Sequence, residues 1–259
     1  MEAFSELYIV MALAALLAGL VDAVVGGGGL IQVPALFSVL PQAAPATLFG
    51  TNKLASICGT AIAACTYWQR YSIDWRLVGP ASLAALVSAF AGAWAVTIFP
   101  PVVLRKLLPF VLLLVAIYVL RRKDFGLVHS PLANGMRKTC LALSVGAAVG
   151  AYDGFFGSGT GSFLVFLFVR GFGLDFLRAS AAAKIVNVVC NFAALAWFIP
   201  AGQPLWVLGL LMACCNIAGS MLGVRLAVTR GSGFVRKLFL FVVSVLILKT
   251  SWDAFGPLL

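Results

Sequence analysis

The feature that most constrains this chain is the length of its uncharged apolar stretches. Residues 77–104 and 185–224 contain no charged side chain, and neither do residues 107–120. About 20 apolar residues are enough to cross a bilayer as a helix. Only 10% of the residues are charged and 63% are hydrophobic, whereas an ordinary soluble domain is about 25% charged. The sequence therefore predicts an all-α integral membrane protein. Glu2 and Glu6, rather than basic residues, precede the first segment, so we expect it to be retained and not cleaved as a signal peptide.

The net charge of +10 could suggest a nucleic-acid partner, but the placement of the basic residues argues against one. They lie mainly in short loops between apolar segments, as is typical of cytoplasmic loops that face anionic lipid. We therefore expect the lipid bilayer as a partner and no nucleic acid. The basic loop residues are Arg70, Arg76, Arg121, Arg122, Lys123, Arg137, Lys138, Arg170, Arg178 and Arg230.

The second half of the chain repeats the first at an offset of 131 residues. The offset places GLVDAVVGGGGLIQVPALF (19–37) on GAYDGFFGSGTGSFLVFLF (150–168), Lys53 on Lys184, and RKLLPFV (105–111) on RKLFLFV (236–242). Leucine-rich helices often match by chance, but a shared offset that also aligns Asp, Lys and an Arg-Lys pair indicates an internal repeat. We predict a first repeat over 1–121, a basic linker over 122–138 and a second repeat over 139–259.

Each repeat is predicted to contain about five hydrophobic segments. In the first half they cover 5–25, 28–40, 46–69, 77–99 and 104–120, and in the second half 139–156, 160–172, 178–199, 205–227 and 236–252. The second segment of each half is short for a full span. It is either a half-helix in a re-entrant hairpin or a short span, and the sequence leaves both open.

Loop charge predicts the topology. The loops at 41–46, 98–104 and 200–205 carry no charge, whereas those at 70–76, 121–138, 170–178 and 225–237 are basic. Basic loops stay in the cytoplasm, so we expect the 122–138 linker inside and both termini outside. Each half then crosses the membrane an odd number of times, and the repeats are inverted. Inverted repeats are a recurring transporter plan with the substrate near the midplane, where helices are broken.

Two glycine motifs mark where helices break. Gly26–Gly29 and Gly157–Ser162 occupy matching positions, and each would end one helix and start another. A restarting helix presents free N–H groups and the positive end of its dipole, which favour an anion. Ser158, Thr160 and Ser162 add hydroxyls, and Gln32 adds an amide. The alternative is that the glycines only permit close helix packing.

Lys53 and Lys184 lie in the third segment of each half. An ammonium group within a membrane helix is a functional candidate by default, although lysines also reach out to the membrane surface. Thr51 and Asn52 flank Lys53, while Asn187 and Asn191 follow Lys184 on its helix face. Two lysines beside two glycine turns would form an anion-binding site.

Asp22 and Asp153 precede the two glycine motifs. They are candidates for counter-ions to the lysines, for proton carriers, or for caps of the restarting helices. The six cysteines show no CxxC spacing and His129 is the one histidine, so the sequence predicts no metal site and no cofactor. The absence of a buried histidine also argues against a membrane-embedded enzyme.

The motifs together resemble one known family. D-A-x-x-G-G-G-G-L-I-x-V-P-A-L, then G-T-N-K-L, then Y-D-G-F-F-G-x-G-T-G-S-F, then K-x-x-N are similar to those of the sulfite exporter TauE/SafE family. The resemblance covers nearly the whole chain. It implies a multi-pass protein of the bacterial inner membrane that moves sulfur-containing anions such as sulfite or small organosulfonates.

We therefore expect a secondary transporter that exports such an anion through a site between the repeats. An anion channel with the same site, or an importer of a small organic thio- or sulfo-acid, is the alternative. A coupling proton carried by Asp22 or Asp153 is a further expected partner, and a homodimer remains open. The expected substrate-binding residues are Gly26, Gly27, Gly28, Gly29, Gln32, Thr51, Asn52, Lys53, Gly157, Ser158, Gly159, Thr160, Gly161, Ser162, Lys184, Asn187 and Asn191.

Overall fold

A computed structural model describes residues 2–40, 42–98, 129–202 and 204–255 of the chain. Within these ranges every regular element is a helix and no strand occurs, which confirms the expected all-α class. The predicted segment at 104–120 and the first part of the linker, 122–128, lie outside the described residues.

The described helices follow the predicted segments closely. α6 begins at Met136, three residues before the predicted start at 139, and α8 continues through Pro200 to Gly202. α9 consists of two helices joined at Gly231, where φ is 74° and ψ is −179°, so it covers the predicted ninth and tenth segments. The helices are α1 (Glu2–Val25), α2 (Gly29–Val39), α3 (Pro45–Trp68), α4 (Trp75–Val96), α6 (Met136–Phe155), α7 (Thr160–Phe172), α8 (Phe176–Gly202) and α9 (Trp206–Phe255).

Four stretches of the described helices are long and apolar enough to cross a membrane: Glu6–Val25, Trp75–Val96, Phe176–Gly202 and Trp206–Val242. Together with the membrane character of the sequence, they make this a multi-pass protein.

The second helix of each half is short. α2 has 11 residues and α7 has 13, which at 1.5 Å per residue gives about 16 and 20 Å. The hydrocarbon core is about 30 Å thick. α2 packs back against α1, and α7 packs back against α6. These lengths favour the half-helix interpretation over the full span.

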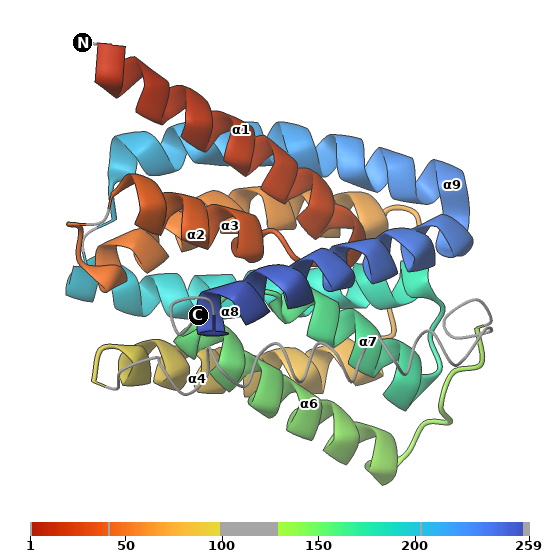
Figure 1. Ribbon diagram of the computed structural model, residues 1–259. Coiled ribbons are helices and arrows are strands. Elements are labelled where there is room, and N and C mark those ends of the chain that lie inside the picture. Colours follow the sequence, from red (N-terminus) through yellow and green to blue (C-terminus); the bar gives the residue numbers. More distant parts are fainter. Residues whose placement is uncertain (1, 41, 99–128, 203, 256–259) are drawn as a thin grey trace.

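The helices lie side by side in an elongated bundle (Figure 1). α1 packs along α9 and α4 packs along α6, while α3 and α8 pack against each other and against α9 and α4, respectively. Small residues permit the closest of these contacts. A Cβ on Gly19 of α1 would lie 2.2 Å from the Asn216 carbonyl oxygen of α9, and one on Gly150 of α6 would lie 2.7 Å from the Ala85 Cα of α4. Asn216 and Ser220 also donate to α1, to the carbonyls of Ala15 and Gly19.

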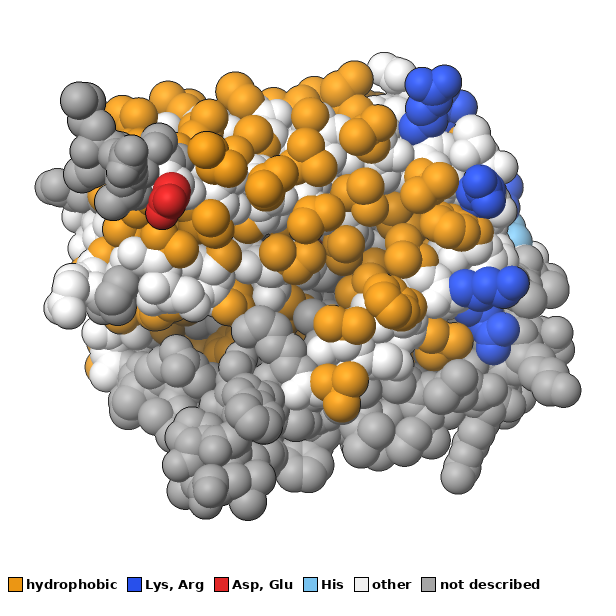
Figure 2. All heavy atoms as spheres, turned by 45° about the horizontal axis from the view of Figure 1, so that its top comes forward, with side chains coloured by type: hydrophobic (Ala, Val, Ile, Leu, Met, Phe, Trp, Pro, Cys, Tyr) orange, Lys and Arg blue, Asp and Glu red, His pale blue; other side chains and the backbone are white. Residues whose placement is uncertain are grey.

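The two ends of the bundle differ in charge. Figure 2 shows Lys and Arg side chains gathered at the right-hand edge. That edge carries the α3–α4 loop, the α7–α8 loop and the bend of α9 (Figure 1). α1 begins, and α9 ends, toward the opposite side (Figure 1). The basic loops at 70–76, 170–178 and 225–237 therefore lie at one end of the described bundle.

Most of the aromatic residues near helix ends face outward, as expected for an aromatic belt. Trp68, Trp75, Trp94 and Trp206 are each about half exposed. Tyr67 of α3 is an exception. It is fully buried, and its hydroxyl donates to the Ala23 carbonyl at 3.1 Å.

Candidate functional site

The chain reverses at two glycine turns in the centre of the bundle. The first joins α1 to α2 and the second joins α6 to α7. Gly26 has a φ of 78° and its repeat partner Gly157 has a φ of 68°. Both values lie in the left-handed region, which glycine enters without the steric penalty of a Cβ atom. The turn geometry therefore requires glycine at the same position of each motif.

The two turns also touch each other. A Cβ on Gly26 would lie 2.2 Å from the Gly161 carbonyl carbon. The Ser162 N–H donates to the Gly26 carbonyl at 2.7 Å, and the Ser162 hydroxyl donates to the carbonyls of Val25 and Gly26 at 2.9 Å. The Ser158 hydroxyl donates to the Gly29 carbonyl at 3.4 Å. Close packing is thus one purpose of the glycines, and Ser158 and Ser162 hold the two turns together.

Contact between the two turns leaves several of their backbone N–H groups without a hydrogen-bond acceptor. Within the described part of the chain, the N–H groups of Gly27–Gly29 and Ser158–Gly161 have no acceptor. These are the first amides of α2 and α7 and of the turns before them. A group of such amides is a ready-made environment for an anion.

Each buried lysine forms an ion pair with an aspartate of the other half of the chain. Lys53 Nζ lies 2.5 Å from Asp153 Oδ2, and Lys184 Nζ lies 2.9 Å from Asp22 Oδ2. The lysine side chains are 2% and 0% exposed. Neither lysine reaches the membrane surface, so the surface-reaching alternative is wrong. The carboxylates act as counter-ions, one of the three roles that the sequence left open.

Hydroxyl and amide groups complete the two pairs. The Thr160 hydroxyl donates to Asp153 Oδ1 at 2.7 Å, and Lys53 also donates to Asn191 Oδ1 at 3.0 Å. The Thr60 hydroxyl donates to Asp22 Oδ2 at 3.2 Å. The Lys53 ammonium lies against the second turn, since a Cβ on Gly157 would be 3.4 Å from its Nζ.

A small cavity of about 20 Å³ lies between the two turns. That volume accommodates about one water molecule, so the space is too small for a larger ligand in this conformation. Eight of its lining residues were expected to bind substrate and Asp22 to carry a proton. The lining residues are Asp22, Gly26, Gly29, Ser56, Thr60, Gly157, Gly159, Thr160, Gly161, Asn187 and Asn191.

Several expected residues do not line the cavity, and Lys53 and Lys184 are among them. Thr51 donates to the Thr47 carbonyl at 2.7 Å and accepts from the Leu205 N–H at 2.9 Å, so it connects α3 to the start of α9. Gln32 accepts from the Ser56 hydroxyl at 3.1 Å, but its Nε2 is buried without a partner. The Asn52 Oδ1 is likewise buried and unpartnered.

Ser56 and Thr60 were not among the expected binding residues, although both line the cavity. The repeat contained the signal that would have found them. The offset of 131 residues places Asn187 on Ser56 and Asn191 on Thr60. The polar face of α8 thus has a counterpart on α3 with shorter polar side chains.

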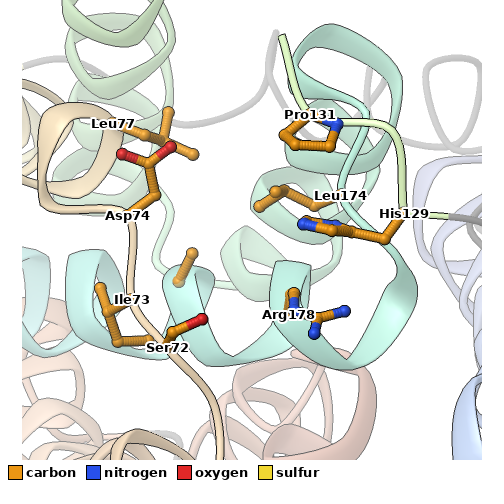
Figure 3. Close-up of a pocket in the computed structure, with 9 residues that line it drawn as sticks. Ser72, Ile73, Asp74, Leu77, His129, Pro131, Leu174 and Arg178 are labelled. Atoms are coloured by element: carbon orange, nitrogen blue, oxygen red, sulfur yellow. The ribbon is translucent and has the colours of Figure 1, made fainter. Parts of the chain in front are cut away.

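A larger cavity of about 160 Å³ opens at the basic end, beside the start of α8. In Figure 3, His129 and Arg178 lie on one side of it and Asp74 on the other. Arg178 pairs with Asp175 at 2.6 Å, and Asp74 pairs with Lys138. Nearby, burial and the Asp175 carboxylate raise the pKa of the Tyr71 phenol, which therefore stays neutral near physiological pH. The other residues that line this cavity are Ser72, Ile73, Leu77, Pro131, Leu174 and Ala182.

The described residues contain no cluster of three or more His, Cys, Asp or Glu side chains that could hold a metal ion. The charges that they bring together in the core are the two lysines and the two aspartates.

Comparison with known proteins identifies the family. The model of the family described as sulfite exporter TauE/SafE matches residues 11–250. This chain belongs to the sulfite exporter TauE/SafE family. The resemblance noted from the glycine and GTNK motifs is thereby confirmed.

Curated relatives of the TauE/SafE chain are named as transporters. It is 33% identical over 264 residues to the probable membrane transporter protein YfcA of Escherichia coli K12, covering 99% of this chain and 96% of YfcA. It is 33% identical over 245 residues to the probable membrane transporter protein ORF9 of a Sinorhizobium species, covering 95% and 92%. A probable membrane transporter of Haemophilus influenzae is 30% identical, covering 91% of each chain. No solved structure matches the chain.

Proposed function

We propose that this membrane transporter exports a small sulfur-containing anion, sulfite or an organosulfonate, across the bacterial inner membrane. The observation that carries the proposal is the pair of buried lysines beside two glycine turns with free amides. Ammonium and N–H groups are the donors that an oxyanion needs. The family supports sulfur as the element, because the matching family is described as a sulfite exporter.

Three buried side-chain amides near the turns support an oxyanion as the ligand. Gln32 is fully buried and its Nε2 donor has no partner, although a buried donor without an acceptor costs about 1–3 kcal/mol. Asn187 and Asn191 add amide groups to the cavity wall. A ligand with several acceptor oxygens would satisfy these donors together.

Contacts between the two halves occur in pairs that the repeat offset interconverts. This supports an inverted repeat whose symmetry axis passes through the site. The offset of 131 residues converts the Lys53–Asp153 pair into the Lys184–Asp22 pair. It also converts the contact of Gly19 with Asn216 into that of Gly150 with Ala85. A twofold axis relates the halves in this way, and the odd number of crossings expected for each half puts that axis in the membrane plane. With the basic end in the cytoplasm, both termini lie outside and the linker lies inside.

The small volume of the cavity favours a transporter over a channel with the same site. A sulfite ion has four heavy atoms and does not fit in a space of about 20 Å³. Substrate entry therefore requires the bundle to open, as in alternating access around a fixed site. Such a cycle has a kinetic signature. The flux saturates with substrate concentration, and unlabelled substrate on the far side of the membrane accelerates it.

The test is efflux of labelled sulfite, in parallel with a labelled sulfonate, from preloaded bacterial cells and from proteoliposomes. Expression of the wild-type protein should accelerate efflux in cells, and Lys184→Ala and Lys53→Ala should abolish it. Lys138→Ala is the matched control, because it removes a buried lysine that pairs with Asp74 outside the site. Accelerated uptake instead of efflux would indicate an importer. Flux that does not saturate would indicate a channel. Absence of flux for both sulfite and the sulfonate would overturn the proposal.

A further inference from the structure

The described core of the site is electrically neutral. It contains two ammonium groups and two carboxylates, and each lysine is already bonded to one aspartate. A monovalent anion added to this arrangement would leave one uncompensated negative charge away from water, which is strongly unfavourable. The anion would also have to displace a carboxylate to reach a lysine. Both difficulties disappear when one carboxylate takes up a proton as the anion binds.

We propose, on the basis of the anion-transport function, that Asp22 takes up this proton and that anion and proton cross the membrane together. The proton binds to the Asp22 carboxylate, which becomes a neutral carboxylic acid. The Lys184 ammonium is thereby released and binds the anion. The site then holds two ammonium groups, one carboxylate and one anion, and is neutral again.

The two aspartates occupy different environments, and the difference selects Asp22. Asp22 lines the cavity and its side chain is 14% exposed. Asp153 is 1% exposed and does not line the cavity. It is held on both oxygens, by Lys53 at 2.5 Å and by Thr160 at 2.7 Å. Only the Asp22 carboxylate therefore has direct access to whatever enters the cavity.

The two lysines differ in the same sense. Lys53 has a second partner, Asn191 Oδ1 at 3.0 Å, which remains if its carboxylate is neutralised. Among the described residues, Lys184 donates to Asp22 and to no other side chain. Protonation of Asp22 thus leaves the Lys184 ammonium in need of an anionic partner. The Lys184–Asp22 pair is the exchangeable one, and the Lys53–Asp153 pair keeps the second turn in place.

Few other ionisable groups face Asp22. Lys184 approaches it from α8 and the Thr60 hydroxyl from α3. Tyr67 of α3 is also close, but its hydroxyl donates to the Ala23 carbonyl. Tyr152 and Cys190 are near Asp153 instead. The proton that accompanies the anion therefore has one carboxylate to bind beside the cavity.

Coupling of this kind makes transport electroneutral. The anion and its proton move in the same direction, so the membrane potential does not drive the cycle, whereas the pH difference does. Anion affinity should rise with falling pH by up to about tenfold per pH unit, the limit for one coupled proton. An outward anion gradient would carry protons out with it.

The experiment uses proteoliposomes with a pH-sensitive dye inside and methanesulfonate outside. A sulfonate stays ionised over the working pH range, so any proton movement belongs to the protein. Wild-type protein should acidify the lumen by one proton per anion taken up, at a rate unchanged by a potassium diffusion potential. Asp22→Asn, which mimics the protonated acid, should exchange anion for anion without moving protons, and its anion affinity should not change with pH. Asp153→Asn is the matched control and should keep the pH dependence of binding.

A second measurement keeps the proposal testable if Asp22→Asn fails to fold. The ratio of protons to anions and the effect of the potential are then measured on the wild-type protein alone, with ethanesulfonate, which also stays ionised, as a second probe. Anion flux that carries charge and leaves the lumen pH unchanged would overturn proton coupling while the transport function stood. Lumen acidification that persists in folded Asp22→Asn would overturn the assignment to Asp22. Absence of any anion flux would instead contradict the transport function itself.

Discussion

Lys53 of α3 and Asp153 of α6 are a hundred residues apart in the chain, and their side chains form a buried ion pair of 2.5 Å. Lys184 and Asp22 form the matching pair, in which the second half of the chain supplies the lysine and the first half supplies the aspartate. Each half of the chain thus supplies the counter-ion for the lysine of the other half. Motion of one half relative to the other has to act on both pairs at once, which connects the charge arrangement to opening of the site.

The first prediction concerns the stability of the Lys53–Asp153 pair. Lys53→Ala should destabilise the protein by about 3–5 kcal/mol, because the Asp153 carboxylate would be left buried without its cation. The double variant Lys53→Ala/Asp153→Ala should be more stable than Lys53→Ala, since no charge is left unpaired. Thermal unfolding of the single and double variants in detergent measures this coupling. Strict additivity of the two changes would show that the side chains do not interact.

The second prediction concerns the glycine turns. Gly26→Ala should be strongly destabilising, because its φ of 78° disfavours a Cβ and the new atom would lie 2.2 Å from Gly161. Gly233→Ala is the control, since a Cβ on this α9 glycine meets nothing within 4 Å. In the control, the helix should gain up to about 1 kcal/mol. Thermal unfolding midpoints should therefore move in opposite directions, and equal midpoints would contradict the turn assignment.

The third prediction separates binding from stability at Gln32. Gln32→Met removes the buried, unpartnered Nε2 but also the acceptor of the Ser56 hydroxyl, so the ligand-free protein should stay within about 1 kcal/mol of the wild type. If Nε2 donates to the bound anion, affinity should fall by about 1.5–3 kcal/mol, the range for a hydrogen bond to a charged group. Titration with sulfite monitored by thermal shift gives both quantities. Unchanged affinity would remove Gln32 from the binding site.

The fourth prediction concerns topology. Cysteines placed at Ser72 and Thr229, near the basic end, should react only with a reagent that reaches the cytoplasm. A cysteine at Ala44, in the uncharged α2–α3 loop, should react from outside. The six native cysteines are first replaced, since several are exposed. Labelling of Ala44→Cys and Ser72→Cys from the same side would contradict the orientation.

Local patterns in the sequence predicted much of the fold. The positions of the glycine turns and the short α2 and α7 follow from hydrophobic segment length and the repeated motifs, whereas the sequence left the burial of both lysines open. The choice of partners could not be predicted. Nothing local shows that Asp22 pairs with Lys184 rather than with Lys53, because that depends on how the two halves pack.

Two other features of the structure could not be predicted from the sequence, for the same reason. Tyr67 lies near a helix end, where aromatic residues usually face the membrane surface, yet tertiary packing buries it and gives it the Ala23 carbonyl. The different environments of Asp22 and Asp153 also depend on packing, because the sequence shows which residues differ between the repeats but not which of them contact the aspartates. Thr160 approaches Asp153, whereas its repeat partner Gly29 has no side chain with which to approach Asp22.

The most direct test of the anion site is binding to the purified protein, measured as thermal stabilisation by sulfite, methanesulfonate, sulfate, thiosulfate, phosphate and chloride. A ligand that binds the folded state raises its apparent stability as the ligand concentration rises. We expect sulfite or methanesulfonate to stabilise the wild type and Lys138→Ala to a similar extent, and to have no effect on Lys184→Ala. Stabilisation that survives in both Lys184→Ala and Lys53→Ala would contradict the assignment of the anion to the buried lysines.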